Sequence, residues 1–102
     1  MEAHMKHFIV EIDYRIPAEQ IGEVVAEHRG YLKKGYDRGW LLFSGPKVPK
    51  TGGIIVARAP SLGALQEFFQ SDPYFVKGIA DYRCVEFDPV LRQAWLDEWV
   101  LS

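Results

Sequence analysis

Two short segments, "WLLF" at residues 40–43 and "IIVA" at residues 54–57, constrain the fold more than any other part of the chain. Each is apolar throughout and lacks the alternation of a strand that has one face in water. If both are strands, both faces of their sheet must be covered. A chain of 102 residues buries only part of its surface on folding. We therefore expect the chain to cover one sheet face itself and to need a further layer on the other.

The first part of the chain predicts a strand followed by a helix. Residues 7–14 alternate, and every second residue from Phe8 to Tyr14 is apolar, which is typical of a strand with one buried face. Pro17 suits the first turn of a helix. The residues that follow it place an apolar stripe at helical spacing, and this stripe comprises Ile21, Val24, Val25, His28, Tyr31 and Leu32. Gly35 or Gly39 can end the helix by adopting a positive φ.

The rest of the chain predicts a hairpin, a second helix, a last strand and a tail. Residues 40–46 and 54–59 are expected to pair as a hairpin across a loop rich in Pro and Gly. Ser61 is a candidate N-cap for a helix, whose apolar stripe comprises Leu65, Phe68 and Phe69. Residues 80–87 form the last expected strand. Residues 90–102 are predicted to be a helical tail, since Leu91, Trp95 and Trp99 recur at every fourth position.

This order, β-α-β-β-α-β with a helical tail, predicts an α+β fold of the ferredoxin-like type, with an antiparallel sheet and both helices on one face. We expect the other face to pack against the sheet of a second subunit, which gives a dimeric α+β barrel. Trp95 and Trp99 would then clamp the partner or seal the barrel. The alternative is a monomer whose tail folds back over its own sheet. Residues 5–102 form one domain, and residues 1–4 are interpreted as a cloning remnant.

Composition excludes several classes of function. The net charge of −2 and the pI near 5.9 do not favour nucleic acid or an anionic membrane as a partner. No apolar run approaches the roughly 20 residues of a membrane-spanning helix, and the lone Cys84 excludes an internal disulfide. A cytoplasmic location is therefore expected. Neither nucleotide-binding glycine motif is present, and three histidines with one cysteine do not predict a metal site. No cofactor is expected.

His28 and Asp72 are the candidate catalytic residues. His28 lies on the apolar stripe of the first helix, and an imidazole there is either a core histidine or a general base at the edge of a pocket. A base of this kind needs a partner that fixes its tautomer, which a carboxylate provides in other histidine sites. Asp72, followed by Pro73, is typical of a helix N-cap. The two roles of Asp72 are compatible, because a carboxylate accepts several hydrogen bonds.

A second group of candidates lies at the end of the second expected strand. Ser44 offers a hydroxyl, and Gly45 allows a ligand to approach the backbone closely. Together with Pro46, these residues either contact a substrate or simply form a turn. Tyr74 either lines the same pocket or packs beneath it.

The ordered motifs H-x-x-Y-L (28–32), S-G-P (44–46), G-G (52–53) and D-P-Y (72–74) resemble those of the YCII-related family over most of the chain. That resemblance implies a ferredoxin-like protomer that dimerises into an α+β barrel, and a His–Asp pair at His28 and Asp72 as the active site. It also places Ser44, Gly45 and Pro46 near that pocket. The loop GP-x-x-P-x-x-GG resembles the chlorohydroxyquinol dehydrochlorinase-like branch, which implies elimination of HCl from a ring or another proton transfer on a small cyclic substrate.

Two functions follow from these residues. The first is a cofactor-independent lyase or isomerase in which His28 removes a proton from a small cyclic or aromatic, for example chlorinated, substrate while Asp72 orients the imidazole. The second is a non-catalytic small-ligand binder or oligomeric accessory domain in which the same pair only links two segments. A solvent-connected pocket at His28 favours the first, and a sealed His28 favours the second. A haem-dependent monooxygenase with His28 on the iron is a third and weaker option.

Overall fold

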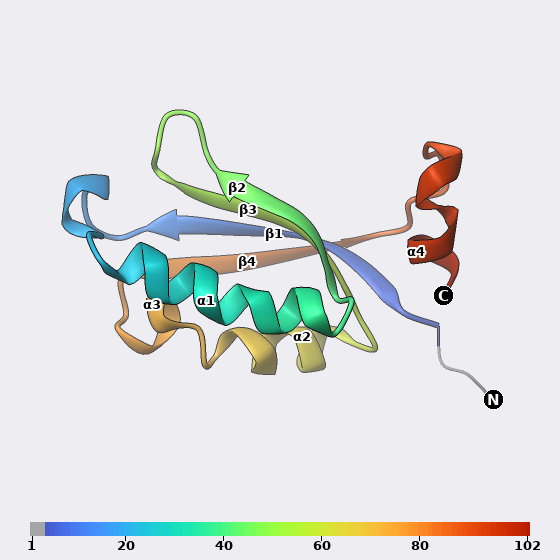
Figure 1. Ribbon diagram of the computed structural model, residues 1–102, viewed down its shortest axis with the longest axis horizontal. Helices are drawn as coiled ribbons and strands as arrows, with labels where there is room; N and C mark the ends of the chain where they lie inside the picture. Colours follow the sequence, from blue (N-terminus) through green and yellow to red (C-terminus); the bar gives the residue numbers. More distant parts are fainter. Residues whose placement is uncertain (1–3) are drawn as a thin grey trace.

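The computed structural model describes residues 4–102, and Figure 1 shows their arrangement. Residues 1–3, which belong to the segment interpreted as a cloning remnant, lie outside the described residues. In chain order the elements are β1 (Lys6–Tyr14), the 3-10 helix η1 (Ala18–Gln20), α1 (Val24–Asp37), β2 (Leu41–Pro46), β3 (Gly52–Ala59), α2 (Leu62–Phe69), α3 (Pro73–Val76), β4 (Ala80–Phe87), the 3-10 helix η2 (Ala94–Leu96) and α4 (Asp97–Leu101).

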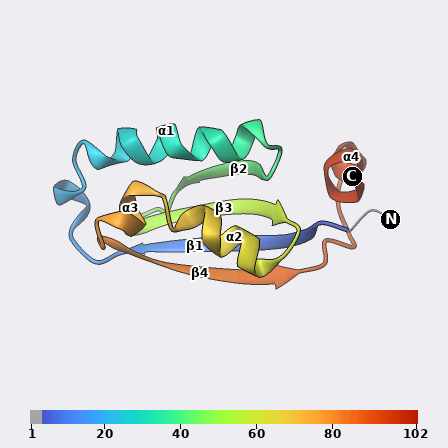
Figure 2. The ribbon, with the colours of Figure 1, turned by 90° about the horizontal axis from the view of Figure 1, so that it is seen from below.

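The four strands form one antiparallel sheet in the order β2-β3-β1-β4, which confirms the ferredoxin-like α+β topology predicted from the element order. Helices α1, α2 and α3 all lie on one face of this sheet (Figures 1 and 2). Among residues 4–102 no helix spans the opposite face, which is called the open face below.

The core lies between the sheet and these helices. As the alternation predicts, Phe8, Val10 and Ile12 of β1 are buried towards the helices. Ser61 caps α2 by accepting a hydrogen bond from the Ala64 N–H. The predicted stripe of α2 is buried against the same core, and it comprises Leu65, Phe68 and Phe69. The helix-facing side of the sheet is therefore covered by the chain itself.

The first helix begins later than Pro17. Ala18–Gln20 form a short 3-10 helix, and Gly22 has a φ of +53°, a left-handed conformation that interrupts a helix. The regular helix α1 therefore starts at Val24. At its other end Gly39 adopts a φ of +76°, so Gly39, and not Gly35, ends the helix.

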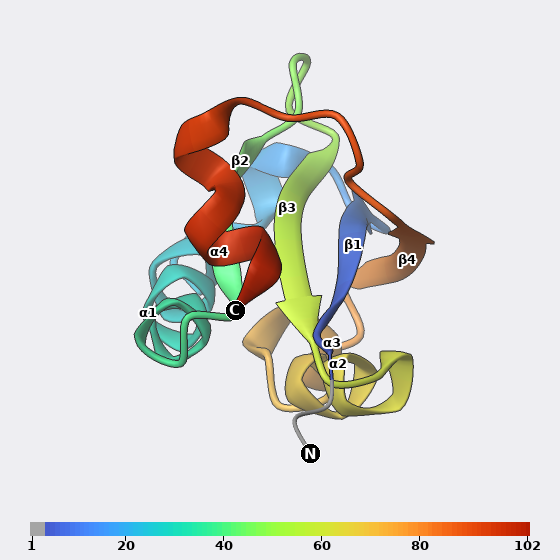
Figure 3. The same cartoon turned by 90° about the vertical axis from the view of Figure 1, so that its right-hand side faces the viewer.

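The tail differs from the single helix predicted for residues 90–102. Its helical part begins only at Ala94, as η2 followed by α4, and Leu91 and Trp95 are exposed. Helix α4 lies at the end of the sheet (Figures 1 and 3). Of the three residues of the predicted stripe, only Trp99 turns inward, where its indole donates to the Gly39 carbonyl at 3.0 Å and its ring contacts His7. The tail thus covers one end of the open face and leaves the rest uncovered.

A β-bulge in β2 decides which way the end of that strand faces. Leu41 pairs with Ala57, but Phe43 pairs with Val56, so two steps along β2 correspond to one step along β3. Ser44 is therefore opposite Ile55, which faces the helices. Without the extra residue the alternation of the strand would turn Ser44 to the open face.

Within residues 4–102, none of the helices combines the length and the apolar character that a membrane-crossing segment requires.

Two glycines of α1 allow a matched test of how closely this helix packs on the sheet. A Cβ at Gly35 would lie 2.8 Å from Leu41 Cγ and 3.0 Å from Phe68 Cζ, whereas a Cβ at Gly30 would meet nothing within 4 Å. We expect Gly35→Ala to lower the free energy of unfolding by about 1–3 kcal/mol through overpacking. Gly30→Ala should raise it by about 0.5–1 kcal/mol because alanine favours the helix. Urea unfolding measures both, and equal effects would contradict the close contact at Gly35.

Candidate active site

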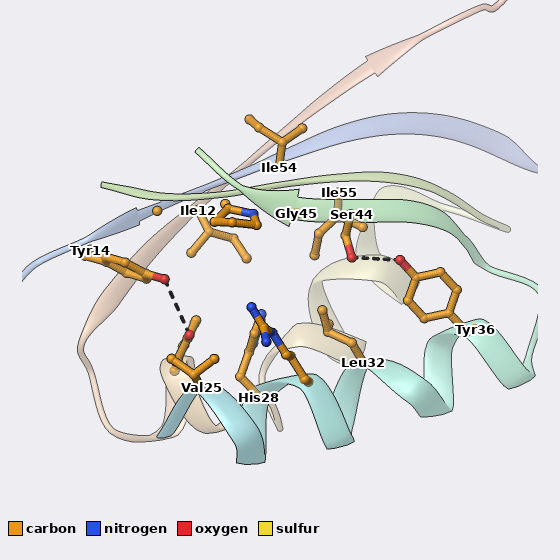
Figure 4. A pocket seen from close by; sticks show the side chains of 15 residues that line it. Ile12, Tyr14, Val25, His28, Leu32, Tyr36, Ser44, Gly45, Ile54 and Ile55 are labelled. Carbon is orange, nitrogen blue, oxygen red and sulfur yellow. Dashed lines mark hydrogen bonds between the residues drawn. The ribbon is translucent and has the colours of Figure 1, made fainter. Parts of the chain in front are cut away.

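A cavity of about 310 Å³ lies between α1 and the sheet, on the side of β2 and β3 (Figure 4). Its apolar walls include Ile12, Leu32 and Ile55. Its polar lining includes His28 and Ser44, which Figure 4 shows on opposite walls. This volume is at the lower end of the range for ligand sites and suits a molecule about the size of one ring.

His28 and Asp72, the two candidate catalytic residues, are in direct contact. The Nδ1 atom of His28 lies 2.8 Å from both carboxylate oxygens of Asp72. Asp72 is fully buried, and His28 is 8% exposed. Helix α1 supplies the histidine from its sheet-facing stripe, and the turn between α2 and α3 supplies the aspartate.

Asp72 acts as a helix cap and as a histidine partner at the same time. Its Oδ1 accepts the backbone N–H of Tyr74 at 3.1 Å, which caps α3, and Pro73 occupies the first position of that helix. Its Oδ2 accepts the hydroxyl of Tyr82 at 2.7 Å. A buried carboxylate is costly unless donors surround it, and here three groups donate to Asp72.

The Asp72 contact leaves the second ring nitrogen of His28 available. With Nδ1–H donating to the carboxylate, Nε2 carries the lone pair of the neutral imidazole. No hydrogen bond to Nε2 forms within residues 4–102. Nε2 is also not one of the side-chain nitrogen or oxygen atoms of these residues that are fully buried without a partner. Since His28 lines the cavity, this nitrogen is reachable from solvent through it. The arrangement can accept a proton from a molecule in the cavity.

Tyr74 forms the floor beneath the imidazole. Its ring stacks on that of His28 with centroids 3.9 Å apart and planes 8° apart. Burial raises the pKa of the Tyr74 phenol, and its hydroxyl also lies 3.5 Å from the hydroxyl of Tyr14. Tyr74 therefore both lines the cavity and packs beneath the imidazole, which are the two positions considered for it from the sequence.

Ser44, Gly45 and Pro46 all line the cavity on the wall formed by β2. The bulge described above turns the side chain of Ser44 towards α1. There its hydroxyl lies 2.7 Å from the hydroxyl of Tyr36 (Figure 4). Ser44 from β2 and Tyr36 from α1 thus bring two hydroxyls together at the cavity, and either can donate to an oxygen of a bound molecule.

Sequence reasoning missed several members of this site. Tyr82 follows Ala80 at the strand period of two, so its helix-facing position on β4 was readable from the alternation. Arg29 and Tyr36 also line the cavity, and no sequence motif marked either of them. Within residues 4–102, no three His, Cys, Asp or Glu side chains cluster closely enough to hold a metal ion.

Comparisons with known proteins cover most of the chain. Residues 5–88 match the model of the YCII-related domain family. A solved structure of 5-chloro-2-hydroxyhydroquinone dehydrochlorinase from Burkholderia phenoliruptrix AC1100, in complex with 2,5-dihydroxybenzoquinone, superposes with a TM-score of 0.64 at 18% identity. The alignment covers 79% of this chain and 90% of that one. At this identity the likeness shows a shared fold.

A hydroxynitrile lyase from Passiflora edulis gives a TM-score of 0.46 at 13% identity, with 89% of this chain and 100% of that one covered. None of the curated proteins compared with the chain matches it.

Tyr82 allows a test of the buried hydrogen bonds around Asp72. Burial and the Asp72 carboxylate raise the pKa of Tyr82, so the folded chain keeps this proton at a pH at which the unfolded chain loses it. The Tyr82 contribution to the free energy of unfolding is therefore complete below pH about 10 and falls at higher pH. We expect Tyr82→Phe to cost about 1–3 kcal/mol at pH 7 and to make the alkaline decline shallower. Urea unfolding at several pH values measures this, and parallel curves for parent and variant would contradict it.

Proposed function

We propose that this chain, which belongs to the YCII-related domain family, is a cofactor-independent enzyme of the lyase or isomerase type that acts on a small cyclic or aromatic substrate. The observation that carries the proposal is the open Nε2 of His28, reached from a ring-sized cavity while Asp72 holds the other nitrogen. A purely structural histidine has no need of such access. His28 and Asp72 are the proposed catalytic pair.

The proposed reaction begins with proton transfer. Nε2 of His28 takes a proton from a ring carbon, and Asp72 stabilises the imidazolium that forms. In an elimination, the C–H electron pair becomes a new C=C bond while the bond from the adjacent carbon to chlorine breaks and chloride leaves. In an isomerisation, His28 returns the proton to another atom of the ring. In the elimination, His28 then gives its proton to solvent, so that HCl is lost overall, and in the isomerisation it gives the proton back to the ring. Either step restores the neutral imidazole.

The opposite wall supplies the second element of this mechanism. When a proton leaves a ring that carries an oxygen, negative charge moves onto that oxygen. The hydroxyl of Ser44, on the wall facing His28, and that of Tyr36, which reaches Ser44 from α1, can donate to it. Gly45 and Pro46 complete this wall as substrate contacts, and Tyr74 supports the ring of the base.

The family branch and the shared fold indicate which substrates to test first. The solved relative described above is a dehydrochlorinase of a chlorinated hydroxyhydroquinone, and its structure holds a dihydroxybenzoquinone. We therefore propose small oxygenated rings, chlorinated and unchlorinated, as the first panel. The volume of the cavity is compatible with a single ring.

The alternative is a non-catalytic small-ligand-binding or accessory domain. One observation favours it: Asp72 caps α3 and bonds Tyr82, so the His28–Asp72 pair also ties α1 to the turn before α3. Both proposals expect a loss of stability when the pair is broken. Only the enzyme proposal expects a loss of turnover beyond the loss of folded protein.

Two variants of the His28–Asp72 pair distinguish the two proposals. We expect His28→Gln and Asp72→Asn to remain folded by circular dichroism and to lose about 10²–10⁴-fold in turnover. Turnover is measured on the substrate panel as chloride release and as exchange of ring hydrogen for deuterium. His4→Gln, at an exposed histidine away from the cavity, is the matched control and should keep the parent rate. If both variants are folded and fully active, the proposal of an enzyme is refuted and the proposal of a ligand-binding domain remains.

The open face supports a proposal that the functional unit is a homodimer. Four apolar residues form one row across all four strands, since Phe43 pairs with Val56, Val56 with Ile9, and Ile9 with Val85. At the ends of the row Phe43 is 58% exposed and Val85 is 41% exposed. The charged residues beside it are neutralised within the chain, as Lys47 pairs with Glu11 at 2.7 Å. We propose that the sheet of a second copy covers this row, with the exposed Trp95 at its edge.

This assembly predicts a change of mass on adding charge to the open face. The parent is expected to sediment at twice its 11.7 kDa chain mass, and Val85→Lys to sediment as a monomer, because a lysine in an apolar interface is costly. Val76→Lys is the matched control: Val76 is also an exposed valine, but it lies on α3, on the covered side of the sheet. Analytical ultracentrifugation separates these cases, and a monomeric parent would refute the dimer.

A further inference from the structure

We propose that Arg29 makes this cavity specific for ring compounds that carry an oxyanion, either a carboxylate or a phenolate. The inference rests on the proposed function, because it concerns the same cavity, and it names the class of substrate and the residue that selects it. Neither the motifs of the sequence nor the pair His28–Asp72 contains this information.

The spacing of α1 places Arg29 on the cavity side of the helix. Val25, Arg29, Leu32 and Tyr36 follow one another at intervals of four, three and four residues, so they share one face of the helix. All four line the cavity. His28, the residue before Arg29, lies on the neighbouring row of side chains, which is closer to the core. Arg29 is therefore presented along the wall that also carries the base.

The charge of Arg29 is not paired within the part of the chain that the structure describes. Within residues 4–102 no carboxylate lies within the 4 Å of an ion pair from its guanidinium, whereas Arg15, Arg83 and Arg92 each pair with a carboxylate. The cavity lining contains no Asp or Glu that could pair with it. A guanidinium in this position is a ready two-pronged donor for a planar oxyanion.

The electrostatic influence of Arg29 reaches the site itself. Burial raises the pKa of the Tyr74 phenol, and the positive charge of Arg29 opposes that rise. Arg29 thus lies close enough to act on a ring that stacks directly on the His28 imidazole. An oxyanion held by Arg29 would keep the ring of the ligand in the cavity beside Nε2 of His28.

The remaining lining agrees with an anionic ring. Apart from His28, its other polar side chains are hydroxyls, which include Ser44 and Tyr36, and the rest of its lining is aliphatic or aromatic. A ring with an oxyanion places its charge on the arginine and its apolar edge on the walls. A cationic ligand would meet an unpaired positive charge, and a neutral ring would gain nothing from it.

Benzoate and benzamide test this inference, because they have the same size and shape and differ in charge. Their binding to the full chain can be followed by 1H–15N NMR titration. We expect the parent to bind benzoate at least about tenfold more tightly than benzamide. Arg29→Gln should remove that preference by weakening benzoate alone, and Arg29→Lys should keep part of it. Lys33→Gln is the matched control, as it removes the same charge from an exposed position of α1 outside the cavity.

Three results would overturn the inference: equal affinity of the parent for the two probes, unchanged benzoate affinity in Arg29→Gln, or no binding of benzoate up to about 10 mM. The outcome is separable from that of the proposed function. If His28→Gln abolishes turnover while Arg29→Gln binds benzoate as the parent does, only the assignment of Arg29 fails. If Arg29→Gln loses the preference while His28→Gln keeps full activity, only the proposed enzyme fails.

Discussion

The structure depends on one buried carboxylate. Asp72 is fully removed from solvent, and it can remain there only because the imidazole of His28, the backbone N–H of Tyr74 and the hydroxyl of Tyr82 all donate to it. These donors come from α1, α3 and β4, and His28 of α1 is 44 residues away from Asp72 in the sequence. Satisfying this one group therefore brings three elements to a common point, and the position of the imidazole follows from it.

The same arrangement divides the cavity into two functional walls. The wall of α1 carries an imidazole with one hydrogen-bonded and one open nitrogen, together with Arg29, which forms no ion pair within residues 4–102. The wall of β2 carries the Ser44 hydroxyl, which bonds to that of Tyr36 from α1, and a backbone with little side-chain bulk at Gly45. A ligand between these walls meets a proton acceptor on one side and hydrogen-bond donors on the other. Such a division requires α1 to lie close to the sheet, which the absence of a side chain at Gly35 permits.

The sequence predicted the features that repeat or follow a local motif. Alternation identified the buried face of β1, and the Ser61 and Asp72 caps marked the starts of α2 and α3. The fold followed from the order of the elements. The family motifs pointed to His28 and Asp72, which the structure brings into contact, while their role in catalysis stays a proposal.

Features that depend on tertiary context were not predictable in this way. The late start of α1 depends on the left-handed conformation of Gly22, which the sequence permits but does not require. The tail is helical only from Ala94, because Trp99 docks on Gly39 and His7 and Leu91 packs on nothing. Arg29 adjoins His28 in the sequence, and only the geometry of the cavity distinguishes it from an ordinary surface arginine.

The extra residue in β2 has a consequence for how such a domain can change. Leu42 adds one step to the strand, and that step alone orients Ser44 inward, opposite Ile55. Inserting or deleting an odd number of residues before Ser44 in this strand would therefore turn the phenyl ring of Phe43 to the cavity in place of the Ser44 hydroxyl. An even number would keep the hydroxyl there. Relatives that share the His–Asp pair but differ in the length of this strand by one residue would present a different surface to their ligands.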